Sequence, residues 1–323
     1  MIDVTALGEI LIDFTPYGIS EGGQCLYERN PGGAPANVLA CLSKCGKRTA
    51  FIGKVGKDMH GEFLKEVLED NSIITDGLVE DAEVFTTLAF VNLSKAGERS
   101  FSFARKPGAD TCLSEKEINK QLIFDSRVFH IGSLSLTAEP ARSATFTALK
   151  MAREAGCIIS YDPNFREPLW EKKETAMEQM RSVLPYIDIM KLSDEETFLL
   201  TDKNDPKEAG KKLVELGVSI VAVTLGVDGA LVFTKAGCQM VSGYSAKAVD
   251  TTGAGDSFWG GFLYCLLESQ KHPQELSLEE VAEFGKFANA VASLCVEKRG
   301  AIPAMPTMDE IQERLMNEIC KRV

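Results

Sequence analysis

Residues 206–225, PKEAGKKLVELGVSIVAVTL, contain the pattern that decides the fold. Apolar residues recur at helical spacing over residues 206–216, which predicts an amphipathic helix. Gly217 follows at the position where a glycine commonly ends a helix in the left-handed conformation. A β-type run over residues 219–225 comes next, so the stretch predicts a helix that leads into a strand.

The same alternation continues in both directions from this stretch. Further β-type runs occupy residues 4–14, 48–53, 127–132, 157–161 and 187–191. Helical patterns occupy residues 61–69, 140–155 and 171–184, and two longer ones dominate residues 253–296. Strands that alternate with helices pair in parallel and are covered by helices on both faces. We therefore expect one α/β domain over residues 1–323, built on a mostly parallel central sheet.

One region interrupts this alternation. Residues 83–103 have the pattern of two strands around the segment 94–98, which predicts a β-hairpin. A hairpin does not fit a series of right-handed βαβ units, so we expect a small antiparallel sheet that projects from the domain. Residues of about 14–30 and 83–105 would form this sheet, which could close over a site as a lid.

Composition disfavours several classes of protein. The chain has 323 residues, with 35 Lys and Arg against 47 Asp and Glu, and its net charge of −12 disfavours a nucleic-acid partner. We find neither an apolar stretch of the roughly 18 residues that span a bilayer nor a secretory leader, so we expect a cytoplasmic protein without a membrane partner. The nine cysteines include no Cys-x-x-Cys pair, which disfavours a disulfide framework or a zinc site.

The strongest chemical signal is the stretch DTTGAGDSF at residues 250–258, which leads from a β-type run into an apolar helical pattern. Small residues at the start of a helix let backbone N–H groups approach an anion, and the helix dipole adds positive charge there. Asp256, at the inner edge of this turn, could take the proton from an attacking hydroxyl group. The structural alternative is that Asp256 caps the helix and the glycines allow close packing.

Four weaker signals lie elsewhere in the chain. Residues 30–37, NPGGAPAN, suit a hydroxyl-rich ligand through the Asn37 amide, although such a cluster alone is more often a turn and helix start. Asp13 lies at the carboxyl end of the first strand, at the edge where open α/β sheets bind ligands, or it is a solvated strand end. Ser193 and Glu196 have capping-box spacing, and the glycines of residues 224–229 suit a plain turn.

Several common motifs are missing from the sequence. It contains no Gly-x-x-x-x-Gly-Lys-[Ser/Thr] loop, no His-Arg-Asp catalytic loop, no Gly-x-Ser-x-Gly elbow and no complete Gly-x-Gly-x-x-Gly after the first strand. These absences disfavour Walker-type ATPases, protein kinases, α/β hydrolases and the common NAD-dependent dehydrogenases.

Together and in order, these segments resemble the PfkB, or ribokinase-like, family of carbohydrate kinases. GGAPAN at residues 32–37 is similar to the family's N-terminal signature and residues 250–256 to its C-terminal one, and the resemblance runs from residue 8 to residue 306. It implies that Asp256 is the catalytic base. The implied anion hole consists of Gly253, Ala254 and Gly255. The implied sugar contacts are Asp13, Gly32, Gly33 and Asn37.

The resemblance also implies a site for ATP and Mg²⁺. Ser193 and Glu196 fall on the family's Asn-x-x-Glu motif, whose glutamate helps to place Mg²⁺ through water; here Ser replaces the usual Asn. The remaining implied nucleotide contacts are Thr224, Gly226, Gly229 and Asn289. Asp250 and Thr252 fall on a loop for a monovalent cation such as K⁺, closed by the segment around Gly300. Ala304 stands where some ribokinases offer a serine oxygen, which leaves K⁺ dependence open.

Within the family, several segments are similar to fructokinases, namely residues 32–37, 97–101, 105–110 and 162–170. Arg105 and Arg166 lie in two of these segments and could contact the substrate, whereas a structural Arg166 would bond Asp162 or a helix end. We therefore expect an ATP-dependent fructokinase that phosphorylates the 6-hydroxyl of D-fructose.

Three questions stay open at this level. A cation at Arg105, Lys106 or Arg166 would also suit an acidic sugar, so a 2-keto-3-deoxygluconate kinase or another sugar kinase of the family is the alternative. A sugar-sensing protein without catalysis is more distant, because a sensor does not need Asp256. The apolar arm with Phe101 and Phe103 would permit a homodimer through paired lids, or it would cover the sugar pocket of a monomer.

Overall fold

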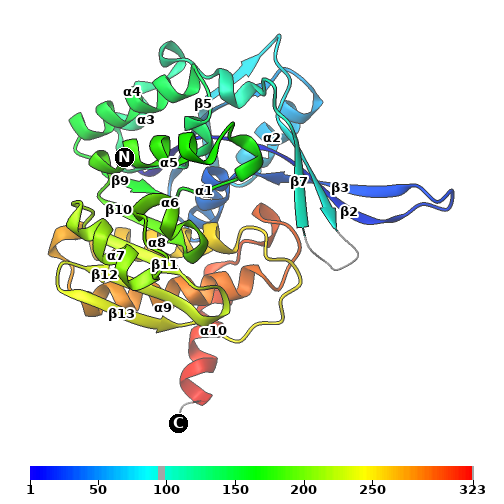
Figure 1. Cartoon of the computed structure of the whole chain (residues 1–323). Helices are drawn as coiled ribbons and strands as arrows, with labels where there is room; N and C mark the ends of the chain where they lie inside the picture. Colours follow the sequence, from blue (N-terminus) through cyan, green and yellow to red (C-terminus); the bar gives the residue numbers. More distant parts are fainter. Residues whose placement is uncertain (94–98, 322–323) are drawn as a thin grey trace.

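A nine-stranded sheet forms the centre of the molecule (Figure 1). The structure, a computed structural model, describes residues 1–93 and 99–321. The strand order is β13-β12-β11-β10-β9-β8-β1-β4-β5, and every pair from β11 to β5 is parallel. β12 pairs antiparallel with both of its neighbours. The strands are β1 (Ile2–Leu7), β4 (Thr49–Gly56), β5 (Ile73–Asp81), β8 (Ser126–Ile131), β9 (Ile158–Tyr161), β10 (Ile189–Ser193), β11 (Ile220–Thr224), β12 (Gly229–Thr234) and β13 (Gly237–Ser242).

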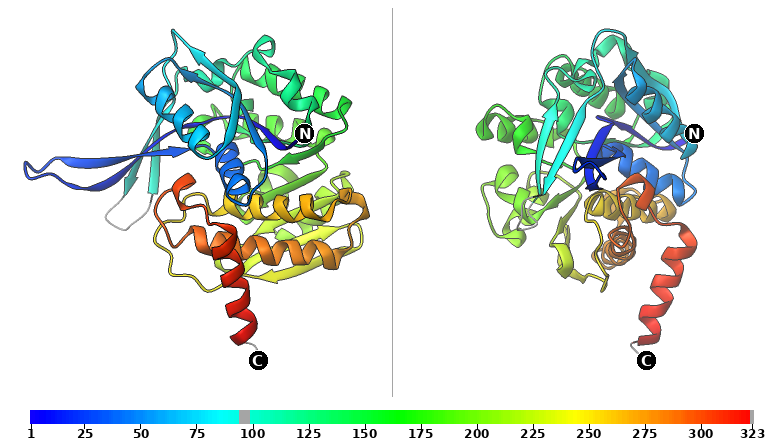
Figure 2. Two further views of the ribbon diagram at one scale, coloured as in Figure 1. Left: turned by 180° about the vertical axis from the view of Figure 1, so that it is seen from behind. Right: turned by 90° about the vertical axis from the view of Figure 1, so that its right-hand side faces the viewer.

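Helices cover both faces of this sheet, which confirms the predicted architecture (Figure 2). Successive strand residues point to opposite faces, so Ala6 packs in one hydrophobic core and Leu7 in the other. The first core is closed by α1 (Ala34–Lys44), α2 (Met59–Asp70), α8 (Ala254–Ser269), α9 (Leu278–Cys295) and α10 (Met308–Lys321). The second core is closed by α3 (Lys120–Phe124), α4 (Ala141–Glu154), α5 (Lys173–Ser182), α6 (Thr197–Thr201) and α7 (Pro206–Glu215).

A second, four-stranded sheet has the order β3-β2-β6-β7. Its strands are β2 (Leu11–Ile19), β3 (Cys25–Gly32), β6 (Leu88–Leu93) and β7 (Arg99–Ala104). Two antiparallel hairpins, β2–β3 and β6–β7, are joined by parallel pairing of β2 with β6. The hairpin β2–β3 extends well beyond the main body (Figure 1). The predicted turn at residues 94–98 lies outside the described residues.

The single β-type run predicted over residues 4–14 is two strands in different sheets. The chain leaves the central sheet after Leu7 and enters the four-stranded sheet at Leu11. Residues 8–10 are all buried like their neighbours, and only Glu9 among them is charged. Hydrophobic periodicity therefore does not reveal the break. This crossing places Glu9 and Asp13 beside the carboxyl end of β1.

Within the described ranges, no helix combines the length and the apolar composition that crossing a membrane requires.

Candidate active site

A cavity of about 590 Å³ opens at the carboxyl ends of the central strands. Its walls come from the segment after β1, the amino ends of α1 and α8, the loop after β9, and the ends of β10 and β11. Parallel strands present their carboxyl ends at one edge, where open α/β sheets commonly bind ligands. The cavity thus brings together the two glycine-rich stretches, residues 32–37 and 250–256, that are more than 200 positions apart in the sequence.

The amino end of α8 forms one wall of the cavity. Gly253 is the N-cap residue and has φ +78, a left-handed conformation that a glycine adopts without strain. No described side chain caps this helix, and residues 253–255 at its start line the cavity beside the positive end of the helix dipole. The N–H of Ala254 donates to the carbonyl of Thr251 at 3.3 Å. Asp256 lies inside the first turn and is not the capping residue. This arrangement suits a bound anion.

Asp256 is held by amide groups from two other segments. Asn37 donates from Nδ2 to Oδ2 of Asp256 at 2.7 Å, and Asn164 donates to Oδ1 at 3.5 Å. The carboxylate lines the cavity yet is only 7% exposed. Burial is the main cause that raises its pKa to about 6; the charge of Asp162 adds to the shift, and Lys191 opposes it. A carboxylate with this pKa is ionised at neutral pH and can accept a proton.

Lys191 lies next to this carboxylate and was not among the predicted site residues. Its ammonium Nζ contacts the two carboxylate oxygens of Asp162 at 3.0 and 3.2 Å. Burial disfavours the charged form, but Asp162, Glu196 and Asp256 outweigh it and raise the pKa of Lys191. The ammonium therefore stays charged inside the site. Its signal in the sequence is a lysine within the otherwise apolar strand β10.

The predicted sugar contacts lie in or beside the same cavity wall, and one of them, Asn37, binds Asp256. Asp13 lines it, and a Cβ on Gly32 would lie 2.1 Å from Asp13 Oδ2, so the glycine makes room for that carboxylate. Gly33 also lines the cavity, with φ +116. Burial raises the pKa of Asp13 to about 7; the guanidinium of Arg166 opposes this shift, and the charge of Asp256 adds to it.

Glu9 is a second cavity residue that the sequence analysis did not select. Its Oε1 accepts the backbone N–H of Ala34 at 2.9 Å, at the start of α1, while Oε2 has no partner among the described residues. Burial raises the pKa of Glu9 to about 7, and Asp110 adds to the shift. Glutamate is seldom this deeply buried, so composition and spacing alone favour a solvated position for it.

The structure places the two candidate arginines differently. Arg166 lines the cavity, and its guanidinium donates to the backbone oxygen of Phe165 at 3.0 Å. Asp162, its suggested structural partner, binds Lys191 instead. Arg105 is not among the described residues that line the cavity; its guanidinium is buried against Asp110 at 2.6 Å and also donates to Thr137 and to the carbonyl of Leu134.

Four of the predicted nucleotide residues line the cavity, namely Ser193, Glu196, Thr224 and Gly226. Ser193 and Glu196 do form the capping box that their spacing indicates. The Glu196 carboxylate accepts the N–H of Ser193 at 2.8 Å and that of Phe165 at 2.7 Å. Each carboxylate oxygen keeps a second lone pair that could accept a water molecule.

The other two predicted nucleotide residues lie behind this wall. Gly229, with φ +107, is the first residue of β12, where a Cβ would lie 2.1 Å from the carbonyl of Val241. Asn289 in α9 donates to the carbonyls of Val241 and Ser242 at 3.1 and 3.0 Å. Neither is among the described residues that line the cavity, so both support β13 in this structure.

The loop predicted to hold a monovalent cation is closed as the resemblance implies. Asp250 Oδ1 accepts the N–H and the hydroxyl of Thr252 at 2.9 and 2.7 Å, and Oδ2 accepts the N–H of Gly300 at 3.1 Å. These bonds fix the loop that leads into α8. Thr252 is also part of the cavity wall.

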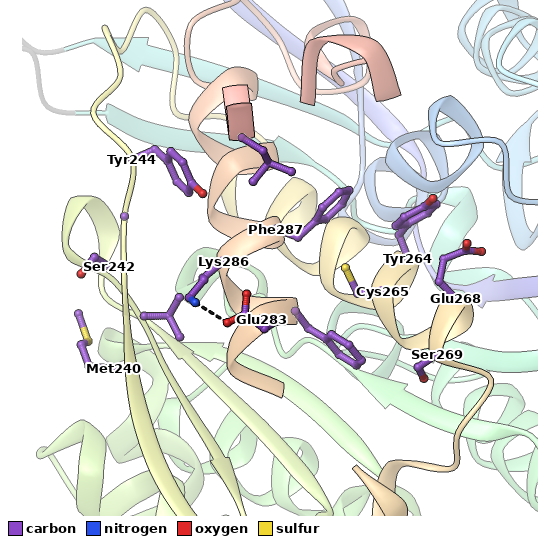
Figure 3. A pocket seen from close by; sticks show the side chains of 14 residues that line it. Met240, Ser242, Tyr244, Tyr264, Cys265, Glu268, Ser269, Glu283, Lys286 and Phe287 are labelled. Carbon is purple, nitrogen blue, oxygen red and sulfur yellow. Dashed lines mark hydrogen bonds and ion pairs between the residues drawn. The ribbon is translucent and has the colours of Figure 1, made fainter. Parts of the chain in front are cut away.

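A second, larger cavity of about 820 Å³ lies between β13, α8 and α9 (Figure 3). Four aromatic side chains are among the residues that line it, and Glu283 forms an ion pair there with Lys286. None of the predicted site residues is among the residues that line it. The smaller cavity therefore carries the candidate chemistry.

Comparisons with known proteins agree with this geometry. Residues 1–308 match the pfkB family carbohydrate kinase profile. The chain is 42% identical over 319 residues to a probable fructokinase-5 of Arabidopsis thaliana, covering 98% of each chain. A fructokinase from Xylella fastidiosa solved with bound ATP superposes with a TM-score of 0.91 at 31% identity, covering 98% of each chain. A double mutant of a Vibrio cholerae fructokinase, solved with fructose, ADP and a potassium ion, gives 0.88 at 33% identity, again covering 98% of each chain.

Proposed function

This chain belongs to the pfkB family of carbohydrate kinases, and we propose that it acts there as an ATP-dependent fructokinase. The reaction would transfer the γ-phosphoryl group of ATP to the 6-hydroxyl of D-fructose. One observation carries the proposal: the Asp256 carboxylate and the uncapped amino end of α8 line the same cavity as Asp13 and Asn37. A base, an anion-binding helix end and hydroxyl-binding groups are the parts that this reaction needs.

In the proposed mechanism, Asp13, Asn37 and the backbone at Gly33 position the sugar. Asp256 accepts the proton of the 6-hydroxyl as its oxygen attacks the terminal phosphorus. The N–H groups at Gly253, Ala254 and Gly255 stabilise the negative charge on the transferring group, which spreads over its outer oxygens. The bond between that phosphorus and the bridging oxygen then breaks, and ADP leaves with the electron pair.

The nucleotide would lie on the side of the cavity formed by Ser193, Glu196, Thr224 and Gly226. Gly226 supports this proposal because a Cβ there would meet open space, which leaves the backbone accessible. Glu196 fits a Mg²⁺ held through water, since both of its oxygens have a lone pair left after binding backbone N–H groups. When bound, Mg²⁺ would neutralise charge on the phosphates. Gly229 and Asn289 would act indirectly, by fixing the chain beside the nucleotide.

The loop at Asp250 and Thr252 is our proposed site for a monovalent cation. The N–H of Gly300 closes this loop, and the chain runs from the loop directly into α8, so a bound K⁺ would order the N–H groups of the anion hole. A related Vibrio cholerae fructokinase was solved with a potassium ion, which supports the choice of K⁺ as the ion.

We propose that the four-stranded sheet acts as a lid over the sugar. Phe103 of β7 lines the cavity, which brings this sheet to the reacting groups. Closure would exclude water, which otherwise competes with the sugar as acceptor.

Exposed apolar side chains on the β2–β3 hairpin, such as Ile19 and Tyr17, also leave a homodimer through this sheet as a prediction. The extent of the lid, a single domain over residues 1–323, and a cytoplasmic location stay predictions too.

A substrate panel tests the proposed function. The experiment measures coupled ADP release with Mg-ATP across fructose, glucose, ribose and 2-keto-3-deoxygluconate. We expect turnover of fructose well above that of the other three sugars. Arg105 is already bound by Asp110 and is not among the described residues that line the cavity. Of the two candidate arginines, Arg166 is therefore the one that could pair with a sugar carboxylate. Activity confined to 2-keto-3-deoxygluconate would replace fructokinase with the alternative kinase, and activity on none of the sugars would overturn the proposal.

A further inference from the structure

Lys191 presents an ammonium group that the mechanism above does not use. The residue is 6% exposed, lies near the carboxyl end of β10 and lines the active-site cavity. Its described hydrogen bonds run only to the two oxygens of Asp162, which together occupy at most two of the three ammonium protons. One N–H therefore remains for another acceptor.

The position of this ammonium indicates what that acceptor is. A Cβ on Gly255 would lie 2.7 Å from Lys191 Nζ, so the ammonium rests directly on the first turn of α8. A cation at the amino end of a helix is repelled by the helix dipole. The ammonium is stable at this place once an anion binds between it and the helix end, because the ammonium and the helix dipole then both attract the anion.

Each oxygen of the neighbouring carboxylates of Glu196 and Asp256 already accepts one protein hydrogen bond, and none of these bonds comes from Lys191. Both oxygens of Glu196 bind backbone N–H groups, and both oxygens of Asp256 receive side-chain amides. A purely structural role, in which Lys191 only neutralises buried Asp162, is the competing explanation. A buried ion pair contributes little net stability compared with apolar residues of the same volume. Stabilisation of the fold alone is therefore a weak reason for a lysine at this position.

Building on the proposed function, we propose that Lys191 is a further catalytic residue whose ammonium donates a hydrogen bond to an outer oxygen of the γ-phosphoryl group during transfer. The bond from phosphorus to the sugar oxygen forms, and the bond from phosphorus to the bridging oxygen of ADP breaks. The hydroxyl proton goes to Asp256, and Lys191 keeps its proton throughout. Asp162 is the positioning residue that holds the ammonium beside Gly255.

The test compares the wild type with Lys191→Met and with the double variant Asp162→Asn/Lys191→Met. The double variant removes both charges together, so it avoids the uncompensated buried carboxylate that the single variant leaves behind. We expect both to lower kcat for fructose by about 10²-fold or more, the loss typical of one transition-state donor, with the KM for fructose changed only a few-fold. Recovery of the double variant to within a few-fold of the wild-type kcat would overturn the proposal, because it would show that Lys191 only neutralises Asp162.

A second readout separates catalysis from folding. ADP with aluminium fluoride and fructose mimics the transferring phosphoryl group, so its affinity should fall in the double variant while the affinity for ADP alone stays within a few-fold. Equal retention of both affinities would contradict the proposal. Lys54→Met is the matched control, since Lys54 is 7% exposed and paired with Asp81 and Glu117 away from the cavity; its kcat should stay near that of the wild type. A wild type without fructose turnover would instead contradict the proposed function itself.

Discussion

At the scale of single residues, the pKa of Asp256 controls when the proposed base can work. Burial raises this pKa to about 6, so the carboxylate becomes protonated and inactive as the pH falls below that value. We predict that kcat/KM for fructose falls on the acid side with an apparent pKa between about 6 and about 7, the values for Asp256 and for its neighbour Asp13. A pH–rate profile between pH 4.5 and 8.5 measures it.

Asn37 provides the variant that tests this assignment. Its amide donates to Asp256 and lowers the pKa of that carboxyl, so Asn37→Ala should move the acid limb of the profile to higher pH. Asn119→Ala is the control, because Asn119 binds the backbone of Asp76 on the surface. A limb below pH 5, or one that does not move when Asn37 is replaced, would contradict a role for Asp256 as the base.

At the scale of elements, helix α1 depends on the glycine at its start. Gly33 has φ +116, and a Cβ there would lie 2.4 Å from the carbonyl of Glu9, whereas Gly46 at the other end has φ +81 and open space around it. Gly46→Ala should therefore cost only the backbone strain, about 1 kcal/mol of the free energy of unfolding. Gly33→Ala adds a backbone clash and should cost clearly more.

The same pair of variants should separate in activity. Because the clash would displace the segment that carries Glu9 and the amino end of α1, Gly33→Ala should also raise the KM for fructose about tenfold or more, which costs about 1.4 kcal/mol of binding free energy. Gly46→Ala should leave KM unchanged. Urea unfolding and steady-state kinetics on both variants give the comparison, and equal effects would show that the start of α1 does not shape the sugar site.

The elements also show where sequence patterns succeed. The helix over residues 206–216 and the strand over 219–225 occur as α7 and β11 with shifts of one residue at their ends, because a strong amphipathic period and Gly217 mark them locally. The run over residues 4–14 was predicted as one strand and is two. Which sheet a buried strand joins depends on distant partners such as β8 and β6, and local periodicity carries no information about them.

At the scale of the whole molecule, the buried carboxylates of the active site lower the free energy of unfolding. Burial raises the pKa of Glu9 from 4.5 to about 7, so between these values the folded chain binds a proton that the unfolded chain has released. Stability from this group is therefore lost as the pH rises through that window. We predict that Glu9→Gln gains stability relative to the wild type by about 2 kcal/mol more at pH 8 than at pH 5.5.

Urea unfolding of both proteins at the two pH values gives this difference directly. The comparison between variants is needed because buried His130, whose pKa falls to about 3 mainly through burial, acts in the opposite sense: it costs stability as the pH falls below its usual range. Its contribution is the same in both proteins and cancels. A difference that does not depend on pH would show that Glu9 is not titrating in the folded state.

The site as a whole was only partly predictable from sequence. Asp256, Asn37 and Asp13 stand in glycine-rich segments whose resemblance to a known family selected them, and the structure gathers all three around one cavity. Lys191 lies within β10 and Asp162 directly follows β9, 29 positions earlier, and each has an ordinary local explanation as a single charged residue in or beside a strand. Their pairing follows from the register of β9 and β10, which local sequence patterns do not specify.

The most direct test of the central claim is the kcat of Asp256→Asn with fructose and Mg-ATP. The amide keeps the volume of the carboxylate but cannot take the proton of the attacking hydroxyl, so kcat should fall by about 10²-fold or more. Fructose binding, followed by calorimetry, should persist and show that the site is intact. A variant that keeps kcat within a few-fold of the wild type would contradict the assignment of Asp256 as the base.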